Sequence, residues 1–363
     1  MMSATYHLSP ITYYLITYLR PMSDSAKKDS ADKAIALIRS QAQNRDAHTL
    51  AHELMSGNRA ALAQAITCVE SGPEAMASEI IRLCMPASGR SVRMGITGVP
   101  GVGKSTFIDT FGMALLEAGR KVAVLAVDPS SPISKGSILG DKTRMERLAA
   151  DSRAFIRPSP SSETLGGVAR KTRETILLCE AAGYDTILVE TVGVGQSETA
   201  VHSMTDFFVL LMLAGAGDQL QGIKRGIMEM CDAMIITKAD GNNTSHASRA
   251  KAEYASALHL FPARDDGWFP PVLTTSALEG KGLDDVMNIM NEFVQWMQQR
   301  GLLEERRKQQ NLSWLHETVR AGIIDRFYHN ASVMEHVRKM EAEVASGALS
   351  PFQAATELLS IYN

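Results

Sequence analysis

A run of eight residues, Gly98 to Ser105, has the residue types and the spacing that hold a nucleotide phosphate. It reads Gly-Val-Pro-Gly-Val-Gly-Lys-Ser and fits the pattern G-x-x-x-x-G-K-[S/T]. Glycines let successive backbone N–H groups turn inward around a phosphate, and a helix that begins near Lys104 adds its positive end. Lys104 would reach the terminal phosphates, and the Ser105 hydroxyl would bind Mg²⁺. The predicted phosphate-binding residues are Gly98, Val99, Pro100, Gly101, Val102, Gly103, Lys104, Ser105 and Thr106.

Two later segments predict that the base is guanine. In the run Thr237-Lys238-Ala239-Asp240, the Asp240 carboxylate can accept hydrogen bonds from guanine N1–H and the 2-amino group, a donor pair that adenine lacks there. The Lys238 stem would lie along the base. Ser276-Ala277 would offer a backbone N–H to guanine O6. Thr237 stands where the usual motif has Asn, and either segment alone could be an ordinary turn, but their order after a phosphate loop favours guanine.

Three acidic residues predict the metal site. Asp128, Asp141 and Glu190 lie at the ends of apolar runs or in a polar loop, where carboxylates repel one another unless a cation lies between them. We expect Asp128 and Glu190 to contact Mg²⁺ through bound water, and Asp141 to contact the metal or the attacking water. The alternatives are a capping role for Asp128 and a solvated loop charge for Asp141. Together with Ser105, these residues form the predicted metal set.

The loop 190–196 predicts a sensor of the terminal phosphate. Gly193 would donate its N–H to the γ-phosphate, so the loop would respond to hydrolysis. Gln196 either positions the attacking water or is an ordinary polar loop residue. No residue is an obvious strong general base, and the catalytic candidates are Lys104, Asp141 and Gln196.

The elements that must position these residues alternate along the chain. Short apolar runs typical of buried strands occupy residues 94–97, 121–127, 154–156, 185–189, 207–214, 233–237 and 271–277. Helical patterns cover 104–118 and 168–182 between them, and 283–300 after the last run. This alternation predicts an α/β fold with a doubly wound, mostly parallel sheet, in which ligands bind beyond the carboxyl ends of the strands.

Helical segments flank this predicted domain. We divide the chain into an extension over 1–30 that is disordered or loosely packed, a helical segment over 31–88, a nucleotide-binding domain over 89–300 and a helical arm over 301–363. Met22 is an alternative start. Within the arm, helical patterns cover 312–328, 331–346 and 351–361. These helices either fold back on their own domain or form a surface for a dimer or another partner.

Composition excludes several classes of protein. A hydrophobic content of 45% and a charged content of 21% are ordinary for a globular protein. The formal net charge of −3 gives no electrostatic reason to expect nucleic acid or an acidic membrane as partner. The four widely spaced cysteines, with no C-x-x-C pair, predict buried free thiols. The scattered histidines, including His202 and His246, predict surface or core roles. We expect a cytoplasmic protein, or a mitochondrial matrix protein if the source is eukaryotic.

Together these motifs resemble the MeaB/ArgK family of P-loop GTPases, of the SIMIBI class. The resemblance rests on residues 98–106, 128–132, 136–145, 190–196 and 238–241. It implies a dimeric, Mg²⁺-dependent GTPase that acts as chaperone of an adenosylcobalamin-dependent acyl-CoA mutase of the methylmalonyl-CoA type. Such a protein gates cofactor delivery and protects the mutase, and the adenosyltransferase of the mutase is a further expected partner.

The resemblance also implies that Lys104, Asp128, Asp141 and Glu190 form the phosphate and metal site, and that the C-terminal helices make the homodimer. Two alternatives remain open. One is a kinase or ATPase linked to basic amino acid transport, for which no acceptor motif is visible. The other is a nickel-insertion GTPase, which needs a Cys/His cluster that the cysteine spacing does not provide.

Overall fold

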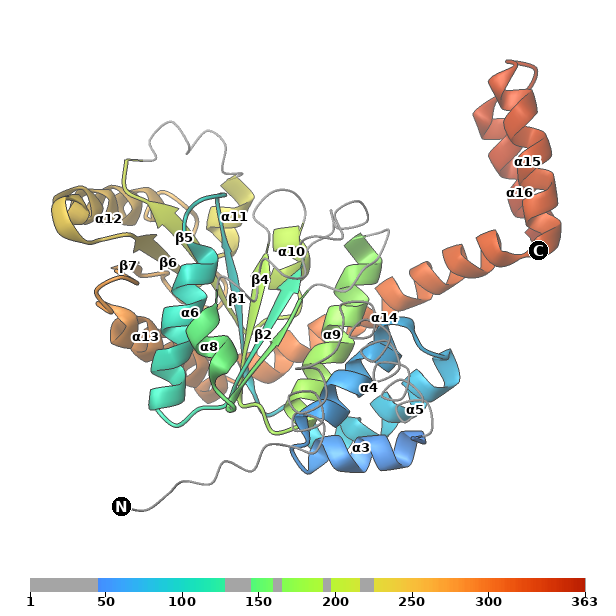
Figure 1. Ribbon diagram of the computed structural model, residues 1–363. Helices are drawn as coiled ribbons and strands as arrows, with labels where there is room; N and C mark the ends of the chain where they lie inside the picture. The colour runs from blue at the N-terminus through green and yellow to red at the C-terminus, as the bar shows by residue number, and fades with distance from the viewer. Residues whose placement is uncertain (1–44, 128–144, 159–164, 192–196, 216–224, 363) are drawn as a thin grey trace, which may run out of the picture.

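Seven parallel strands form the centre of the protein (Figure 1). The computed structural model describes residues 45–127, 145–158, 165–191, 197–215 and 225–362. The strand order within this part is β3-β2-β4-β1-β5-β6-β7, and every neighbouring pair is parallel. The strands are β1 Val92–Gly98, β2 Val122–Val127, β3 Ala154–Arg157, β4 Thr186–Thr191, β5 Phe207–Leu213, β6 Ala233–Thr237 and β7 Val272–Thr274. The predicted doubly wound sheet is therefore confirmed.

Helices cover both faces of the sheet, because the strands are apolar on both sides. On one face lie α6 (Lys104–Glu117), α8 (Glu146–Ala150) and α13 (Leu283–Gln299), which bury Phe107, Phe111 and Phe293 against it. The other face is covered by α9 (Leu165–Ala181), α10 (Ser197–His202), α11 (Arg225–Met230) and α12 (Thr244–Leu258). Helices α8, α10, α11 and α12 had not been predicted from the sequence.

Three N-terminal helices extend the hydrophobic core on the second face of the sheet, the face that α9 covers. They are α3 (Ala47–Met55), α4 (Arg59–Ser71) and α5 (Glu74–Cys84), followed by the short η1 (Met85–Ala87). Each of the first two begins with a side-chain cap: Asp46 accepts from Thr49 N at 2.7 Å, and Asn58 accepts from Ala60 N at 3.0 Å. Their buried apolar residues pack beside α9. The extension predicted over 1–30 lies outside the described residues.

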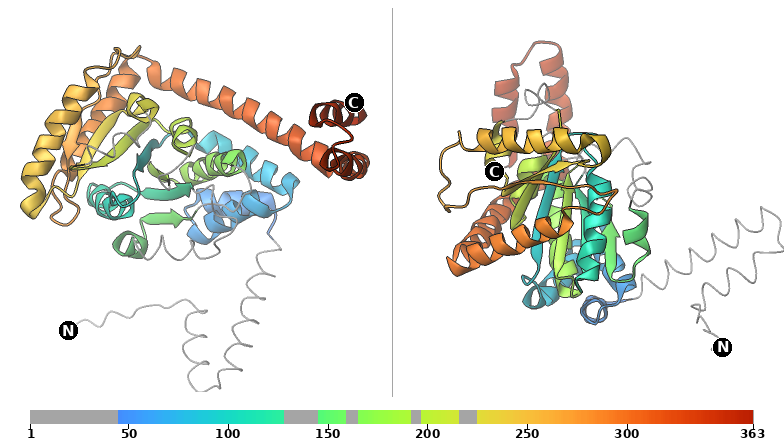
Figure 2. Two further views of the ribbon diagram at one scale, coloured as in Figure 1. Left: turned by 90° about the horizontal axis from the view of Figure 1, so that it is seen from above. Right: turned by 90° about the vertical axis from the view of Figure 1, so that its left-hand side faces the viewer.

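The C-terminal helices form an arm that projects from the sheet (Figure 2). Helix α14 (Leu302–His329) crosses the domain and leads away to the hairpin of α15 (Ala331–Ala345) and α16 (Pro351–Tyr362). The hairpin is not folded back on the domain. Helix α14 begins at Leu302 rather than at the predicted Leu312, because its first turns are polar and are held by ion pairs that periodicity does not reveal.

The cysteines and histidines largely follow expectation. All four cysteines are free; Cys84, Cys179 and Cys231 are buried, whereas Cys68 is half-buried. His202 packs edge-on against Phe208, and His246 is exposed. No helix in the described part of the chain combines the length and the apolar character that crossing a membrane requires.

Candidate nucleotide-binding site

The phosphate loop connects the carboxyl end of β1 to the start of α6. Gly103 precedes the helix with φ 95°, a conformation that side chains of L-residues rarely adopt. Gly98 approaches the neighbouring strand so closely that an added Cβ would lie 2.6 Å from Leu211 O. The sheet and the helix therefore fix the path of this loop, and only glycine fits at these two positions.

The Lys104 side chain is folded back under the loop. It is 8% exposed, and its Nζ donates to Gly98 O at 2.8 Å and to Val99 O at 3.4 Å. Burial lowers the pKa of Lys104 below its ordinary value, while the Glu190 and Glu198 carboxylates act in the opposite direction. A cation desolvated in this way favours an anion, so the lysine is placed to bind phosphate.

Ser105 and Glu190 offer hard oxygen atoms side by side. Ser105 Oγ donates to Glu190 Oε1 at 3.2 Å, and Glu190 is 8% exposed near the end of β4. Next to it, Thr191 Oγ1 donates to Thr97 Oγ1 at 2.9 Å, which joins β4 to β1. A hydroxyl and a carboxylate are ligands that Mg²⁺ prefers, directly or through water. These residues therefore fit the predicted metal, although no cluster of three acidic, His or Cys side chains occurs in the described part of the chain.

The segment after β6 holds the phosphate loop from the side. Thr237 is 4% exposed, and its Oγ1 contacts Val102 O at 2.8 Å and Met212 O at 3.2 Å. Lys238 has a positive φ of 56°, and its Nζ donates to Gly101 O at 2.9 Å. Thr237 thus holds the loop with a hydroxyl at the position where the usual motif has Asn.

Asp240 and Ser276 come together beyond the ends of β6 and β7. Ser276 Oγ donates to Asp240 Oδ2 at 2.7 Å. The Ser276 N–H, however, donates to Lys281 O at 3.0 Å, so it is already occupied. Within the predicted pair Ser276-Ala277, Ala277 therefore remains the predicted backbone donor to guanine O6. Ser276 instead holds the Asp240 carboxylate.

Four predicted site residues lie outside the described residues: Asp128, Asp141, Gly193 and Gln196. One buried residue was missed by sequence reasoning. Glu198, in the first turn of α10, is 4% exposed, and its Oε2 has no hydrogen-bond partner among the described residues. The signal that could have found it is its position directly after the predicted sensor loop.

A family model described as "Methylmalonyl Co-A mutase-associated GTPase MeaB" matches residues 62–332, which include this whole site. The chain belongs to the MeaB family. It is therefore a P-loop GTPase, and the resemblance inferred from its motifs is confirmed.

Relatives of the MeaB family match most of the chain. A probable GTPase of Mycobacterium tuberculosis is 50% identical over 86% of this chain and 94% of its own length. GTPase ArgK of Escherichia coli is 48% identical over 82% and 91%. A mouse protein named methylmalonic aciduria type A homolog, mitochondrial, is 47% identical over 85% and 78%. Among solved structures, an LAO/AO transport system kinase is 39% identical, with a TM-score of 0.67 over 87% of this chain and 97% of its own.

Proposed function

We propose that the protein is a GTP-driven switch that serves as chaperone of an adenosylcobalamin-dependent acyl-CoA mutase of the methylmalonyl-CoA type. The observation that carries this proposal is the extent of the family match. It runs from α4 through the nucleotide site and the full length of α14, so the root of the arm belongs to what the family shares. The family's description names methylmalonyl-CoA mutase, and the switch would gate delivery of the cofactor and protect that enzyme.

In this proposal the residues of the site divide the work. Lys104 and the loop N–H groups bind the phosphates, Asp240 and Ala277 bind guanine, and Lys238 lies along the base. Ser105 and Glu190 would hold Mg²⁺, which neutralises charge on the phosphates when bound. The proposal also keeps the predicted roles of four residues outside the described ones: Asp128 and Asp141 at the metal, Gly193 at the γ-phosphate, and Asp141 or Gln196 at the attacking water.

Turnover by the protein alone should be slow. Catalysis in such a site is mostly positioning and charge neutralisation, and the sequence offers no obvious strong base. We therefore expect the mutase to accelerate hydrolysis by completing the site. The test measures GTP hydrolysis with and without methylmalonyl-CoA mutase, with Lys104→Ala as the inactive control. An unchanged rate and an unchanged nucleotide affinity would count against the coupling.

A second assay tests the chaperone role itself. The activity of mutase loaded with adenosylcobalamin is measured over time during turnover. The mutase is assayed with the protein and GTP, with the protein and GDP, and alone. The proposal expects slower inactivation or faster recovery with the protein in a nucleotide-dependent way. The name of the solved LAO/AO transport system kinase favours the alternative of phosphate transfer. Appearance of γ-phosphate on an acceptor, rather than as inorganic phosphate, would support that alternative instead.

We also propose that the arm makes a homodimer. Its longest helix carries an apolar stripe at spacings of four residues, in which Leu315, Val319 and Ile323 are 56%, 49% and 53% exposed. An exposed apolar stripe of this kind marks a surface that another protein chain buries. Leu315→Glu combined with Ile323→Glu should convert dimer to monomer in light scattering, whereas Ser313→Glu on the same helix should not.

A further inference from the structure

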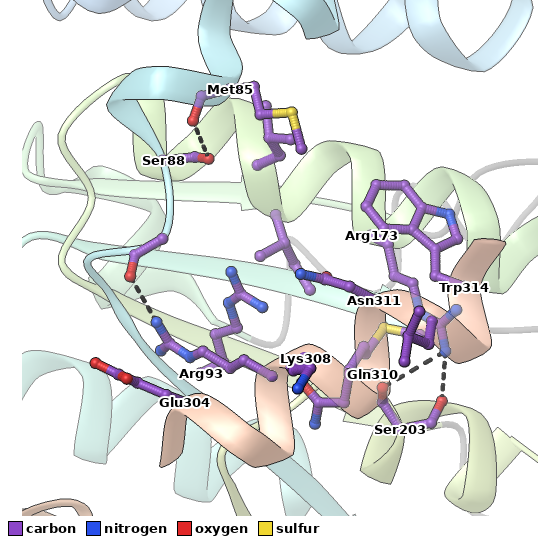
Figure 3. Close-up of a pocket in the computed structure, with 16 residues that line it drawn as sticks. Met85, Ser88, Arg93, Arg173, Ser203, Glu304, Lys308, Gln310, Asn311 and Trp314 are labelled. Atoms are coloured by element: carbon purple, nitrogen blue, oxygen red, sulfur yellow. Dashed lines mark hydrogen bonds between the residues drawn. The ribbon is translucent and has the colours of Figure 1, made fainter. Parts of the chain in front are cut away.

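A cavity of about 560 Å³ lies at the root of the arm, away from the nucleotide site (Figure 3). It opens between η1, α9, the residues after α10 and the first half of α14. Arg93, at the start of β1, and Met204, just before β5, place it at the amino ends of the strands. The phosphate loop follows the carboxyl end of β1, so the two sites lie at opposite edges of the sheet.

The walls of this cavity are apolar but its charged groups are mostly basic. Ile176, Leu177, Met204, Leu312 and Trp314 supply apolar surface. The charged lining residues are four cations and one acid, namely Arg93, Arg173, Arg307, Lys308 and Glu304.

The acids that pair with two of these cations do not line the cavity. Arg93 is paired with Glu180 at 2.9 Å and Arg307 with Asp206 at 2.6 Å, and both carboxylates are buried. A ligand in the cavity would therefore contact the two guanidinium groups and not the carboxylates that pair with them.

Arg173 is the decisive residue. It is only 6% exposed, and its Nη1 donates to Glu317 Oε2 while its Nη2 donates to Ser203 Oγ, each at 2.7 Å. Figure 3 shows Arg173 bound to Ser203. Its Nε–H is buried and has no acceptor among the described residues. A buried donor without an acceptor is unfavourable, so a ligand that supplied an acceptor here would be stabilised.

Two further observations agree with a missing ligand. Gln310 donates through Nε2 to Thr205 O at 2.8 Å, but its buried Oε1 has no partner in the described part of the chain. Burial lowers the pKa of the Arg173 guanidinium, and the Glu317 carboxylate opposes this shift, so an anion bound beside Arg173 would act in the same direction as Glu317.

We propose that this cavity binds a small anionic molecule with an apolar body. Its carboxylate or phosphate accepts hydrogen bonds from Arg173, with Lys308 at the rim, and its hydrocarbon or ring portion packs between α9 and α14. A planar guanidinium suits either anion, and a mostly apolar cavity with a few convergent polar groups is the usual form of a small-molecule site. The ligand would join the sheet to the root of the arm.

The test uses the full chain with saturating Mg²⁺ and GDP, so that the phosphate loop is filled. The probe is anilinonaphthalene sulfonate, an aromatic anion whose fluorescence rises on binding. We expect saturable binding of one probe per chain, with energy transfer from Trp314 that Trp314→Phe reduces. Octanoate and octyl phosphate should displace the probe, and their relative strengths distinguish the two head groups, whereas octanol should not displace it.

Three variants localise the site. Lys308→Glu, whose side chain is 68% exposed, should weaken probe binding at least tenfold without loss of folding. Asn311→Trp should fill the cavity and abolish binding while keeping every charge. Arg173→Gln should also weaken probe binding at least tenfold, and its melting curve shows whether the variant is folded. Arg147→Gln is the matched control, since Arg147 lies on α8 and is 58% exposed.

Two results would overturn the proposal. One is displacement by octanol as strong as by octanoate. The other is unchanged affinity in both Lys308→Glu and Asn311→Trp, as expected if the probe lies instead on the apolar stripe of α14.

Discussion

The Ser276 hydroxyl holds the Asp240 carboxylate with a hydrogen bond of 2.7 Å, although the two residues follow different strands. A carboxylate oxygen accepts more than one hydrogen bond, so Asp240 keeps capacity for the N1–H and 2-amino donors of guanine. The bond fixes the orientation of the carboxylate before the nucleotide arrives. In the proposed site, base selection therefore depends on a contact between two segments.

Replacing the Asp240 carboxylate should change the base that the site prefers. Asp240→Asn presents a donor where guanine also presents donors, and loss of two charged hydrogen bonds should cost about 3 kcal/mol, roughly a hundredfold in affinity for GDP. Xanthosine diphosphate, which carries an oxygen at the 2-position, should bind better to the variant. Calorimetric titration of both nucleotides checks this. Asp265→Asn, at an exposed position, is the control, and equal GDP affinity in both variants would refute the assignment.

The Thr237 hydroxyl should stabilise the empty phosphate loop. Thr237→Val keeps the shape but leaves Val102 O without its side-chain donor, so the free energy of unfolding should fall by about 1 to 2 kcal/mol. Nucleotide dissociation should become several-fold faster. Thr237→Asn restores a polar side chain and should recover much of both losses. Urea unfolding and stopped-flow release of a fluorescent GDP measure the two effects, and a stable Thr237→Val with normal release would contradict this role.

Glu190 should control the affinity for Mg²⁺ rather than for the base. Glu190→Gln removes the charge beside Ser105, and residues that orient metal ligands or their bound water typically contribute about tenfold to a hundredfold in metal affinity. The Mg²⁺ concentration for half-maximal GTP hydrolysis should rise by that factor, while GDP affinity without Mg²⁺ should change little. Glu117→Gln, exposed at the end of α6, is the control. The same Mg²⁺ dependence in both variants would remove Glu190 from the metal site.

The buried thiols should make the protein sensitive to alkali. Burial raises the pKa of Cys84 to about 11 and that of Cys231 to about 12, against 9.0 for a free thiol. Below pH 9 these thiols are protonated in both the folded and the unfolded protein. Above pH 9 they ionise readily only in the unfolded protein. The free energy of unfolding should therefore fall between about pH 9 and pH 12. Cys84→Ala should show a shallower fall in urea titrations across this range.

The same burial predicts which thiol reacts first. A thiolate is the reactive form, so the half-buried Cys68 should be modified first by Ellman's reagent in the native protein. The other three should react only after unfolding. Cys68→Ser should abolish the native reaction, and rapid modification of two or more thiols in that variant would contradict the structure.

Much of the site could be predicted from the sequence because its chemistry is local. Gly98 to Ser105 must turn between a strand and a helix, and the spacing of glycines, Lys104 and Ser105 specifies a phosphate loop. The apolar runs predicted seven strands, and the motifs that follow them predicted the carboxyl edge of the sheet as the binding edge.

Only the tertiary structure decided what depends on contacts between distant segments. The pairing of Ser276 with Asp240, the use of the Ser276 N–H by Lys281 and the burial of Glu198 are set by how strands and loops meet. The start of α14 was missed because Arg307 is held by Asp206, 101 residues earlier, and no local pattern records such a bond. Periodicity reports which face of a helix is apolar, but the ion pairs and the cavity at the root of the arm arise only once the chain has folded.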